Sequence, residues 1–334
     1  MIILNRILRF LKYWLIKTGN LAPRIHQHNG INTVSILMYH GVTERALEVA
    51  DWCFIKACDF EDQIKYIKNN FHVVHLSDAF KQNGNKYKKP IAVITFDDGF
   101  YNNYAIAYPI LEKYQVPATI FLTTGLLNTE ETLWYCNLNL AISSSRKTEF
   151  TWENNIFDIS DNKNKSKSIA KLKKLLKLKT VAEMNKSLVE IYRILEYFPI
   201  PPIPRDSPFR MLDYDAIHEM NKSPLINFGA HTVTHTILTK IPEDESKFEI
   251  KKSIEDVNTI TKKKYQTFAY PNGLPEDFDS FHIKQLQQNN IELAVTTTEG
   301  INHFNADLYR LKRVGVGNDT SMDEFIVRAH GCYC

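Results

Sequence analysis

The 334-residue sequence has few cysteines, no long hydrophobic run and little net charge. Its five cysteines are odd in number and irregularly spaced, which does not fit a disulfide framework and favours a reducing compartment. No uninterrupted apolar stretch approaches the roughly 20 residues of a membrane-spanning helix. A formal net charge of +3 is too small to indicate a nucleic-acid-binding protein, and we find no internal repeat.

The composition that remains is that of a globular protein, with 44% apolar and 24% charged residues. The length allows two domains, or one α/β barrel that carries an insertion. We expect the main domain to span residues 31–334.

Residues 1–30 form a separate, basic and apolar segment that predicts an amphipathic helix. The apolar side chains at positions 3, 7, 11 and 14 share one helical face, and the basic side chains at 6, 9 and 17 lie off it. This pattern fits a helix on an anionic membrane surface, and it equally fits a helix packed on the domain. No small-residue cleavage site follows, which argues against a removable signal peptide.

Short apolar segments rich in Val, Ile, Phe and Thr recur along the chain, and helical patterns lie between several of them. Most run continuously apolar, as strands do when both faces of a parallel sheet are buried. Strands that alternate with helices predict an α/β fold. The segments are 34–40, 72–76, 91–96, 118–124, 225–231, 266–271, 292–298 and 308–316.

Residues 128–205 break this rhythm, because they contain no convincing buried strand. Eight lysines and no acidic residue lie between 163 and 179, among leucines that predict a basic amphipathic helix, and a second helix is predicted over 182–197. We interpret 128–205 as a helical basic insertion in the barrel. Its lysines form a solvated face or contact an anionic lipid or an acidic glycan.

Polar side chains follow the predicted strands where each strand ends. His40 follows the first strand, Asp97 and Asp98 follow the strand at 91–96, His231 follows a later strand, and Tyr270 ends another. In α/β barrels the loops at the carboxyl ends of the strands carry the active site. We therefore expect these side chains to lie near one another.

A metal site would explain two of these groups together. His231 and His235 are four residues apart, and imidazole pairs suit zinc, cobalt or nickel when a third ligand is present. Adjacent carboxylates in a closed site repel each other and raise a pKa, whereas a dication beside one of them removes this difficulty. The stretch Asp97-Asp98-Gly99 taken alone fits a tight turn or a helix cap equally well.

Two motifs carry a resemblance to a known family. The stretches TFDDGF at 95–100 and GAHTVTH at 229–235 resemble the first two motifs of the polysaccharide deacetylase family, also called the NodB-homology or carbohydrate esterase 4 family. LMYHGV at 37–42, FAYPNG at 268–273 and LKRVGV at 311–316 resemble flanking signatures of one branch. The resemblance covers roughly 34–127 and 206–330.

The resemblance implies a fold, a reaction and a set of roles. The fold is a distorted (β/α)7-type barrel, and the reaction removes an N-acetyl group, or occasionally an O-acetyl group, from a sugar. Asp98, His231 and His235 would bind the metal. Asp97 would be the base toward a metal-bound water that attacks the amide carbonyl.

The sequence departs from the family pattern in two places. The arginine that usually orients the base is missing from FAYPNG, and Arg313 either replaces it or forms a structural ion pair. The late Leu-x-His motif that supplies the general acid is also missing, and the branch with Tyr-His after its first strand points to His40 instead. The backbone N–H of Tyr270 is the expected donor to the oxyanion.

Other residues are weaker candidates for the site. Three histidines are less suited than His40 to be the acid, and four aromatic side chains near the site loops either stack on sugar rings or pack in the core. The histidines are His75, His303 and His330, and the aromatic residues are Phe100, Tyr101, Trp134 and Tyr135.

The sequence thus predicts a metal-dependent N-deacetylase of a bacterial surface polysaccharide or of its precursor, with Zn²⁺ as the first choice of metal and Co²⁺ or Ni²⁺ as alternatives. Its partner is an N-acetylated glycan or glycan precursor and not nucleic acid. We expect the protein in the cytoplasm or on the inner membrane, with peripheral attachment through residues 1–18. Alternatives are an O-deacetylase, a non-sugar amidase, or a glycan-binding relic without turnover.

Overall fold

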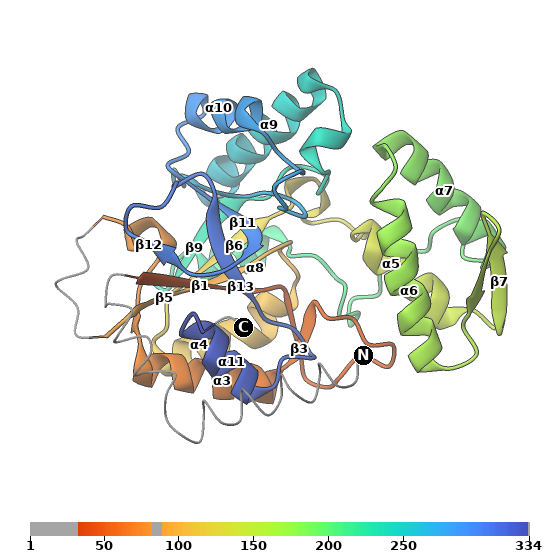
Figure 1. The fold of residues 1–334 in the computed structure, drawn as a ribbon, viewed down its shortest axis with the longest axis horizontal. Coiled ribbons are helices and arrows are strands. Elements are labelled where there is room, and N and C mark those ends of the chain that lie inside the picture. Colours follow the sequence, from red (N-terminus) through yellow and green to blue (C-terminus); the bar gives the residue numbers. More distant parts are fainter. Residues whose placement is uncertain (1–32, 82–88, 333–334) are drawn as a thin grey trace.

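The computed structural model describes residues 33–81 and 89–332 (Figure 1). The helix predicted over 1–30, together with the membrane attachment predicted for 1–18, lies outside these residues. In the part of the chain that is described, none of the helices has the length and apolar character needed to cross a bilayer.

Seven parallel strands close into a barrel because β1 pairs with β5 on one side and with β13 on the other. This confirms the predicted (β/α)7-type barrel. Two short strands extend the sheet: β4 (His72–Val73) lies parallel to β5, and β12 (Asn302–His303) lies antiparallel to β1. In spatial order the barrel strands are β1 (Thr33–Tyr39), β5 (Ile91–Phe96), β6 (Ala118–Leu122), β9 (Ile226–Ala230), β10 (Thr267–Ala269), β11 (Leu293–Glu299) and β13 (Leu311–Gly315).

The alternation of side chains along a strand decides which residues face the barrel interior. In β5, Ala92 and Ile94 belong to the large core between the strands and the surrounding helices. Ile91 and Val93 belong to a second cluster, made with residues of β1, β6, β11 and β13, which fills the barrel. The same alternation carries Asp97 to the interior side of the strand end.

The helices that follow the strands surround the barrel. Figure 1 shows α9 and α10 on one side and α3, α4 and α11 on the opposite side. A five-residue π-helix, η3 (Asn103–Ala107), leads directly into α4. The helices are α3 (Ala57–Asn70), α4 (Tyr108–Tyr114), α8 (Tyr214–Met220), α9 (Glu243–Thr261), α10 (Ser280–Gln288) and α11 (Met322–Ala329). Short elements are the paired strands β2 (Gly41–Thr43) and β3 (Phe54–Lys56), and the 3₁₀ turns η1 (Leu76–Asp78), η4 (Thr124–Leu126) and η5 (Leu238–Lys240).

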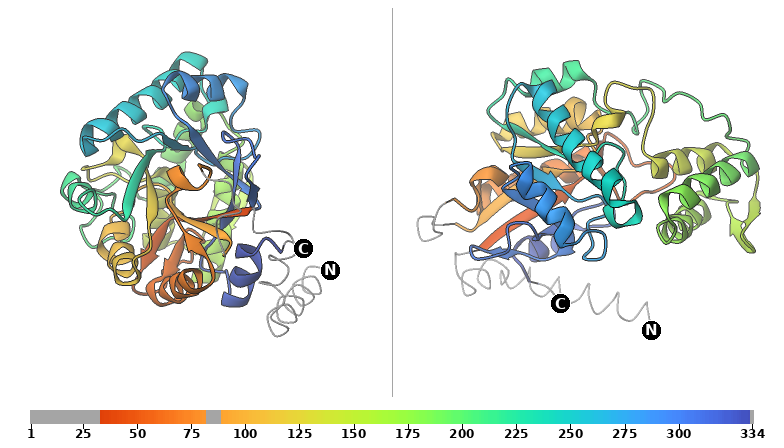
Figure 2. Two further views of the ribbon diagram at one scale, coloured as in Figure 1. Left: turned by 90° about the vertical axis from the view of Figure 1, so that its left-hand side faces the viewer. Right: turned by 90° about the horizontal axis from the view of Figure 1, so that it is seen from above.

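The segment between β6 and α8 lies to one side of the barrel (Figures 1 and 2). It contains α5 (Trp134–Ser144), the hairpin β7 (Glu149–Trp152) and β8 (Asn155–Asp158), α6 (Asn162–Leu176) and α7 (Val181–Ile194), which share one hydrophobic cluster. The two predicted helices correspond to α6 and α7, whereas the hairpin was not predicted. The boundaries 128–205 for an insertion stay a prediction.

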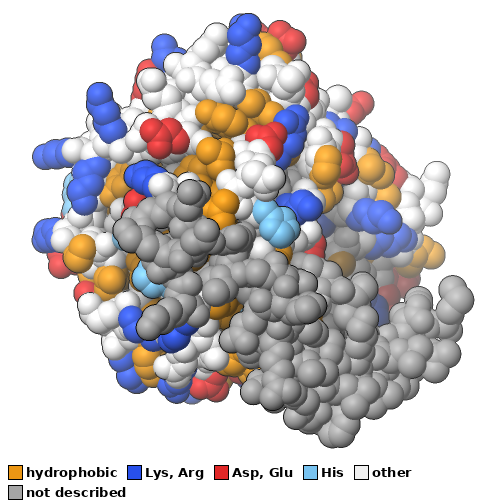
Figure 3. Space-filling model, turned by 60° about the vertical axis from the view of Figure 1, so that its left-hand side comes forward, with side chains coloured by type: hydrophobic (Ala, Val, Ile, Leu, Met, Phe, Trp, Pro, Cys, Tyr) orange, Lys and Arg blue, Asp and Glu red, His pale blue; other side chains and the backbone are white. Residues whose placement is uncertain are grey.

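Two lysines of this segment contact residues outside the segment. The ammonium of Lys173 lies 2.5 Å from a carboxylate oxygen of the buried Asp51, and that of Lys177 lies 2.5 Å from Oδ1 of Asn272. Both partners belong to the barrel side of the molecule. The interpretation of the lysine run as a solvated face is therefore wrong for Lys173, whereas Lys177 is exposed and also contacts Asn272. Elsewhere on the surface, the described residues in Figure 3 show basic and acidic side chains intermixed.

Candidate metal centre and active site

The two adjacent carboxylates point in different directions because the backbone reverses between them. Asp98 has a φ of 75° and Gly99 a φ of 83°, which is the left-handed region. A non-glycine residue rarely adopts this conformation, and such strain is concentrated at functional sites. Asp97 keeps its place at the strand end, with its N–H donated to the Tyr39 carbonyl oxygen at 2.9 Å, while Asp98 turns toward the end of β9.

Asp98 and the two predicted histidines converge. The Oδ1 atom of Asp98 lies 3.6 Å from Nε2 of His231 and 3.3 Å from Nε2 of His235. The three ligand atoms lie within 4.8 Å of one another. Oδ1 is buried and has no hydrogen-bond partner among the described residues. A buried, unpartnered carboxylate oxygen between two imidazoles is the donor set that a divalent cation fills.

A second contact fixes the tautomer of His231. Its Nδ1 lies 2.7 Å from the carbonyl oxygen of Ala269 at the end of β10. Because a carbonyl can only accept, Nδ1 carries a proton, and Nε2 is the ring nitrogen left to bind a cation beside Asp98. Metal-binding histidines are usually oriented in this way.

The charges around this cluster favour a cation. Burial raises the pKa of Asp98, but the two imidazoles outweigh it and hold that pKa well below its ordinary value. Burial lowers the pKa of His231, but the carboxylates of Asp98 and Asp97 outweigh it and raise that pKa. Burial keeps the pKa of His235 below its ordinary value. The Asp98 carboxyl is therefore ionised in the folded protein.

Arg313 holds Asp97 inside the barrel. Its Nη1 and Nη2 lie 2.7 and 2.6 Å from the two carboxylate oxygens of Asp97, and its Nε donates to the Thr296 carbonyl oxygen at 2.7 Å. Both side chains are buried. Burial raises the pKa of Asp97, but Arg313 outweighs it, with help from His231, so the carboxyl stays below its ordinary pKa. The sequence motif left the partner of Arg313 open, and the structure identifies it as Asp97.

His40 lies directly after β1 and is almost fully buried. Its ring meets the edge of the half-exposed Trp52 indole, with 5.0 Å between the centroids, and its Nδ1 has no hydrogen-bond partner among the described residues. Burial lowers the pKa of His40, and the charges of Asp98 and Asp97 oppose this only in part. The structure thus places His40 in the field of both site carboxylates.

Tyr270 does not fit its predicted role. Its backbone N–H donates to the Val295 carbonyl oxygen at 3.2 Å, and its hydroxyl donates to the Tyr309 carbonyl oxygen at 3.2 Å. Its ring is stacked on Phe278 with 3.7 Å between centroids. The N–H expected to stabilise an oxyanion is therefore already used by the sheet. We correct the assignment: Tyr270 is a core residue at the end of β10.

The weaker candidates divide into two groups. Trp134 and Tyr135 lie at the site, whereas Phe100 is fully buried in a core cluster and Tyr101 lies beneath the guanidinium of Arg210. The histidines lie elsewhere: His75 contacts the Pro224 carbonyl oxygen, His303 is exposed in β12, and His330 contacts Tyr66 of α3.

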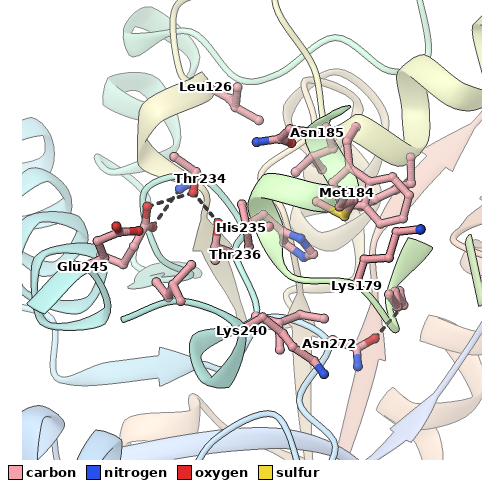
Figure 4. Close-up of a pocket in the computed structure, with 18 of the residues that line it drawn as sticks. Leu126, Lys179, Met184, Asn185, Thr234, His235, Thr236, Lys240, Glu245 and Asn272 are labelled. Carbon is pink, nitrogen blue, oxygen red and sulfur yellow. Dashed lines mark hydrogen bonds between the residues drawn. The ribbon is translucent and has the colours of Figure 1, made fainter. Parts of the chain in front are cut away.

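A cavity of about 710 Å³ opens beside the metal cluster, between the barrel and the segment that contains α5 to α7. His235 lies in its wall, between side chains of that segment, such as Lys179 and Met184, and barrel side chains such as Thr236 and Lys240 (Figure 4). The size is that of a small-molecule or oligosaccharide site. Further lining residues are Leu126, Trp134, Tyr135, Lys177, Asn185, Asp244, Glu245, Phe248 and Asn272.

Sequence reasoning missed four contributions to the site. Tyr135 was considered only as an aromatic residue that stacks on sugar or packs in the core, Lys177 only as part of a basic run, and Trp52 was not considered. Asn272 stood within the recognised FAYPNG motif, but no pattern in the sequence indicated its contact with Lys177.

A parallel (β/α)7 barrel that gathers one carboxylate and two imidazoles near the carboxyl ends of its strands has the form of an enzyme site that can hold a divalent cation. The comparison with known families agrees: the model of the family described as polysaccharide deacetylase matches residues 84–294. The chain therefore belongs to this family. Membership confirms the predicted class of enzyme, an N-deacetylase.

Two similar curated proteins are both named as N-deacetylases. A poly-beta-1,6-N-acetyl-D-glucosamine N-deacetylase of Staphylococcus epidermidis is 24% identical over 264 residues, which cover 78% of this chain and 67% of that protein. The enzyme of the same name from Staphylococcus aureus is 32% identical over 144 residues, which cover 40% of this chain and 47% of that protein. The matched region therefore spans about half the length of the S. aureus relative.

Solved structures show the same fold. The Streptococcus pyogenes deacetylase PplD in complex with acetate aligns with a TM-score of 0.57 at 20% identity and covers 88% of this chain and 96% of that chain. IcaB from Ammonifex degensii aligns with a TM-score of 0.56 at 18% identity, covering 89% of this chain and 96% of that chain.

Proposed function

We propose that this protein hydrolyses N-acetyl groups of an amino-sugar glycan, either a surface polysaccharide or its precursor. The observation that carries the proposal is the unpartnered Oδ1 of Asp98, which faces Nε2 of both His231 and His235 while Arg313 holds Asp97 beside them. The names of the staphylococcal relatives support an N-acetylglucosamine chain as the substrate class.

Asp98, His231 and His235 would hold one divalent cation, with Zn²⁺ as the first choice and Co²⁺ or Ni²⁺ as alternatives. When bound, such a cation supplies a Lewis acid and lowers the pKa of a water ligand to about 7. The buried carboxylate and the fixed tautomer of His231 are what the protein contributes.

Asp97 is the proposed base. Because Arg313 keeps its pKa below the ordinary value, the carboxylate is ionised and can accept a proton from the attacking water. The bidentate contact also sets the direction of the carboxylate, so Arg313 acts as a positioning residue. This arrangement replaces the arginine that the third motif lacks.

His40 is the proposed acid. When water adds to the acetyl carbon and the C–N bond breaks, the departing nitrogen needs a proton, because an amide anion is a very poor leaving group. His40 gives its proton to that nitrogen, and the products are acetate and the free amine of the sugar. The charges of Asp98 and Asp97 support this role, because they favour the protonated imidazole against the effect of burial.

The 710 Å³ cavity is the proposed site of the sugar chain. Trp134 offers an aromatic face, and the polar lining mixes lysines with acidic residues rather than presenting one sign of charge. A largely neutral glycan with many hydroxyl groups matches such a surface.

We place the protein in the cytoplasm or on the inner membrane, with residues 1–18 as the membrane contact. The basic amphipathic pattern of that segment and the free thiols of Cys53, Cys58 and Cys136 support this location. Membrane fractionation of the full chain and of a variant with the basic residues of 1–18 replaced tests it.

Acetate release from nucleotide-linked, lipid-linked and polymeric N-acetylhexosamines, with and without a chelator, tests the proposal. Release that stops with chelator and returns with Zn²⁺ supports it. Release only from O-acetylated sugars or non-sugar amides identifies the alternative hydrolase. Tight glycan binding without release identifies a binding protein.

A further inference from the structure

The two oxygens of the Asp98 carboxylate have different environments. Oδ1 faces the two imidazoles and has no hydrogen-bond partner among the described residues. Oδ2 accepts a hydrogen bond from the hydroxyl of Tyr135 at 2.5 Å. One oxygen is thus pinned by a donor, and the other is left for a cation.

Tyr135 comes from α5, outside the barrel strands that supply the other site residues. Its buried ring is held from two directions. The ammonium of Lys173 lies 4.8 Å from the ring centroid and is itself paired with the buried Asp51. The ring also meets the edge of His235, with 5.8 Å between centroids. The hydroxyl is therefore fixed against Asp98 by packing.

We propose that Tyr135 is a positioning residue of the metal centre, and that the α5–α6 segment is part of that centre and not only of the substrate cavity. The O–H bond to Oδ2 is a hydrogen bond to an ionised acceptor, one of the stronger kinds, and it limits rotation of the carboxylate. With Oδ2 occupied, Oδ1 stays aimed at the space between the imidazoles. The inference rests on the metal site of the proposed function, but not on the identity of the substrate.

The experiment compares metal affinity in the full chain and in Tyr135→Phe, which keeps the ring and removes only the hydroxyl. Each protein is stripped of metal and titrated with Zn²⁺ against a chelating dye, and with Co²⁺ by its visible spectrum. Loss of such an outer hydrogen bond costs about 10- to 100-fold in metal affinity, and we expect this loss with an altered Co²⁺ spectrum.

Tyr192→Phe is the matched control. Tyr192 is another buried tyrosine of the same segment, and its hydroxyl donates to the Trp134 carbonyl oxygen at 3.1 Å instead of to a metal ligand. We expect its metal affinity to equal that of the wild type. A Tyr135→Phe affinity within twofold of wild type, or an equal loss in both variants, overturns the inference.

Activity separates this inference from the proposed function. If Tyr135→Phe loses metal affinity but the wild type releases no acetate from any sugar, the inference stands and the proposed reaction fails. If the wild type releases acetate and Tyr135→Phe binds metal as tightly, the inference alone fails.

Discussion

Arg313 and Asp97, which are 216 positions apart in the chain, form a bidentate ion pair inside the barrel, with N–O distances of 2.7 and 2.6 Å. Arg313 belongs to β13 and Asp97 follows β5, and β1 lies between these two strands in the barrel. The stretch FAYPNG of this chain lacks the arginine that the family usually has there, and the guanidinium beside Asp97 comes from a different strand. The planar guanidinium contacts both carboxylate oxygens, so it keeps Asp97 ionised and also fixes the orientation of its carboxylate.

Removal of the guanidinium should damage both stability and turnover. Arg313→Ala leaves the buried Asp97 without its partner, and we expect a loss of about 3–5 kcal/mol in the free energy of unfolding. Urea unfolding measures this loss. Arg310→Ala is the control, because the ion pair of Arg310 with Asp307 is exposed and its guanidinium lies 5.9 Å from the Phe278 ring centroid, so its loss should cost less than about 1 kcal/mol. Equal losses in the two variants would argue against a buried structural pair.

Arg313→Lys should separate orientation from charge. The ammonium keeps the positive charge but cannot contact both oxygens, so we expect kcat to fall while KM for the glycan changes little. Steady-state kinetics on an N-acetylhexosamine oligomer measures this. If Arg313→Lys kept the wild-type kcat, the orientation of the Asp97 carboxylate would not matter for turnover.

Asp97→Asn should abolish turnover and leave the metal bound. The amide cannot accept the proton, and general-base catalysis contributes about 10²- to 10⁴-fold, so acetate release should fall by at least that range. Metal analysis should still find one cation per chain. His231→Ala should lose both metal and activity, and near-normal release by Asp97→Asn would remove Asp97 from the mechanism.

His40→Gln should slow amide hydrolysis far more than ester hydrolysis. An amine needs a proton to depart, whereas 4-nitrophenolate leaves without one, so 4-nitrophenyl acetate should be hydrolysed at close to the wild-type rate. The amide rate should fall by about 10²- to 10⁴-fold. His75→Gln, which changes a histidine outside the site, should leave both rates unchanged. Parallel loss on both substrates would contradict an acid role for His40.

Lys177→Met should weaken glycan binding, because the Lys177–Asn272 contact joins the α6 end to the barrel at the cavity wall. Loss of one such hydrogen bond corresponds to about a 2- to 10-fold rise in KM, with kcat little changed. Lys174→Met, an exposed lysine of the same helix, is the matched control. Equal KM values in both variants would exclude a role for Lys177 in the cavity.

The stability of the metal-stripped protein should depend on pH through Asp97. Burial raises the pKa of this carboxyl, but Arg313 outweighs it, so the folded-state pKa lies below the ordinary value. Such a group stabilises the fold fully above its unfolded pKa of about 3.9, and the contribution is lost as pH falls through the folded pKa. We expect the free energy of unfolding to fall below about pH 4 more steeply in wild type than in Asp97→Asn. Urea titrations from pH 5 downward test this, and parallel curves would contradict it.

The barrel and the convergence of Asp98, His231 and His235 were predictable because local signals agree with the global fold. Continuous apolar runs such as 91–96 and 118–124 became adjacent parallel strands, and side chains after parallel strands meet at one end of a barrel. This rule brings Asp98 near His231, and the resemblance to the deacetylase motifs added His235.

Contacts between distant segments were not predictable in the same way. Tyr135 is one aromatic residue in an apolar helix, and no periodicity reveals that its hydroxyl reaches Asp98. Lys173 looked like its neighbours in a basic run, since only tertiary packing selects the lysine that turns inward to Asp51, and no pattern showed that the exposed Lys177 contacts Asn272. Tyr270 failed for a related reason: the end of β10 could not be located to one residue, and its N–H still belongs to the ladder with β11.

The position of Arg313 in the last barrel strand has a consequence for biosynthesis. A chain that ends before residue 311 lacks both the guanidinium that pairs with Asp97 and the strand that joins β11 to β1. The barrel therefore closes, and Asp97 gains its partner, only when the last strand has been synthesised.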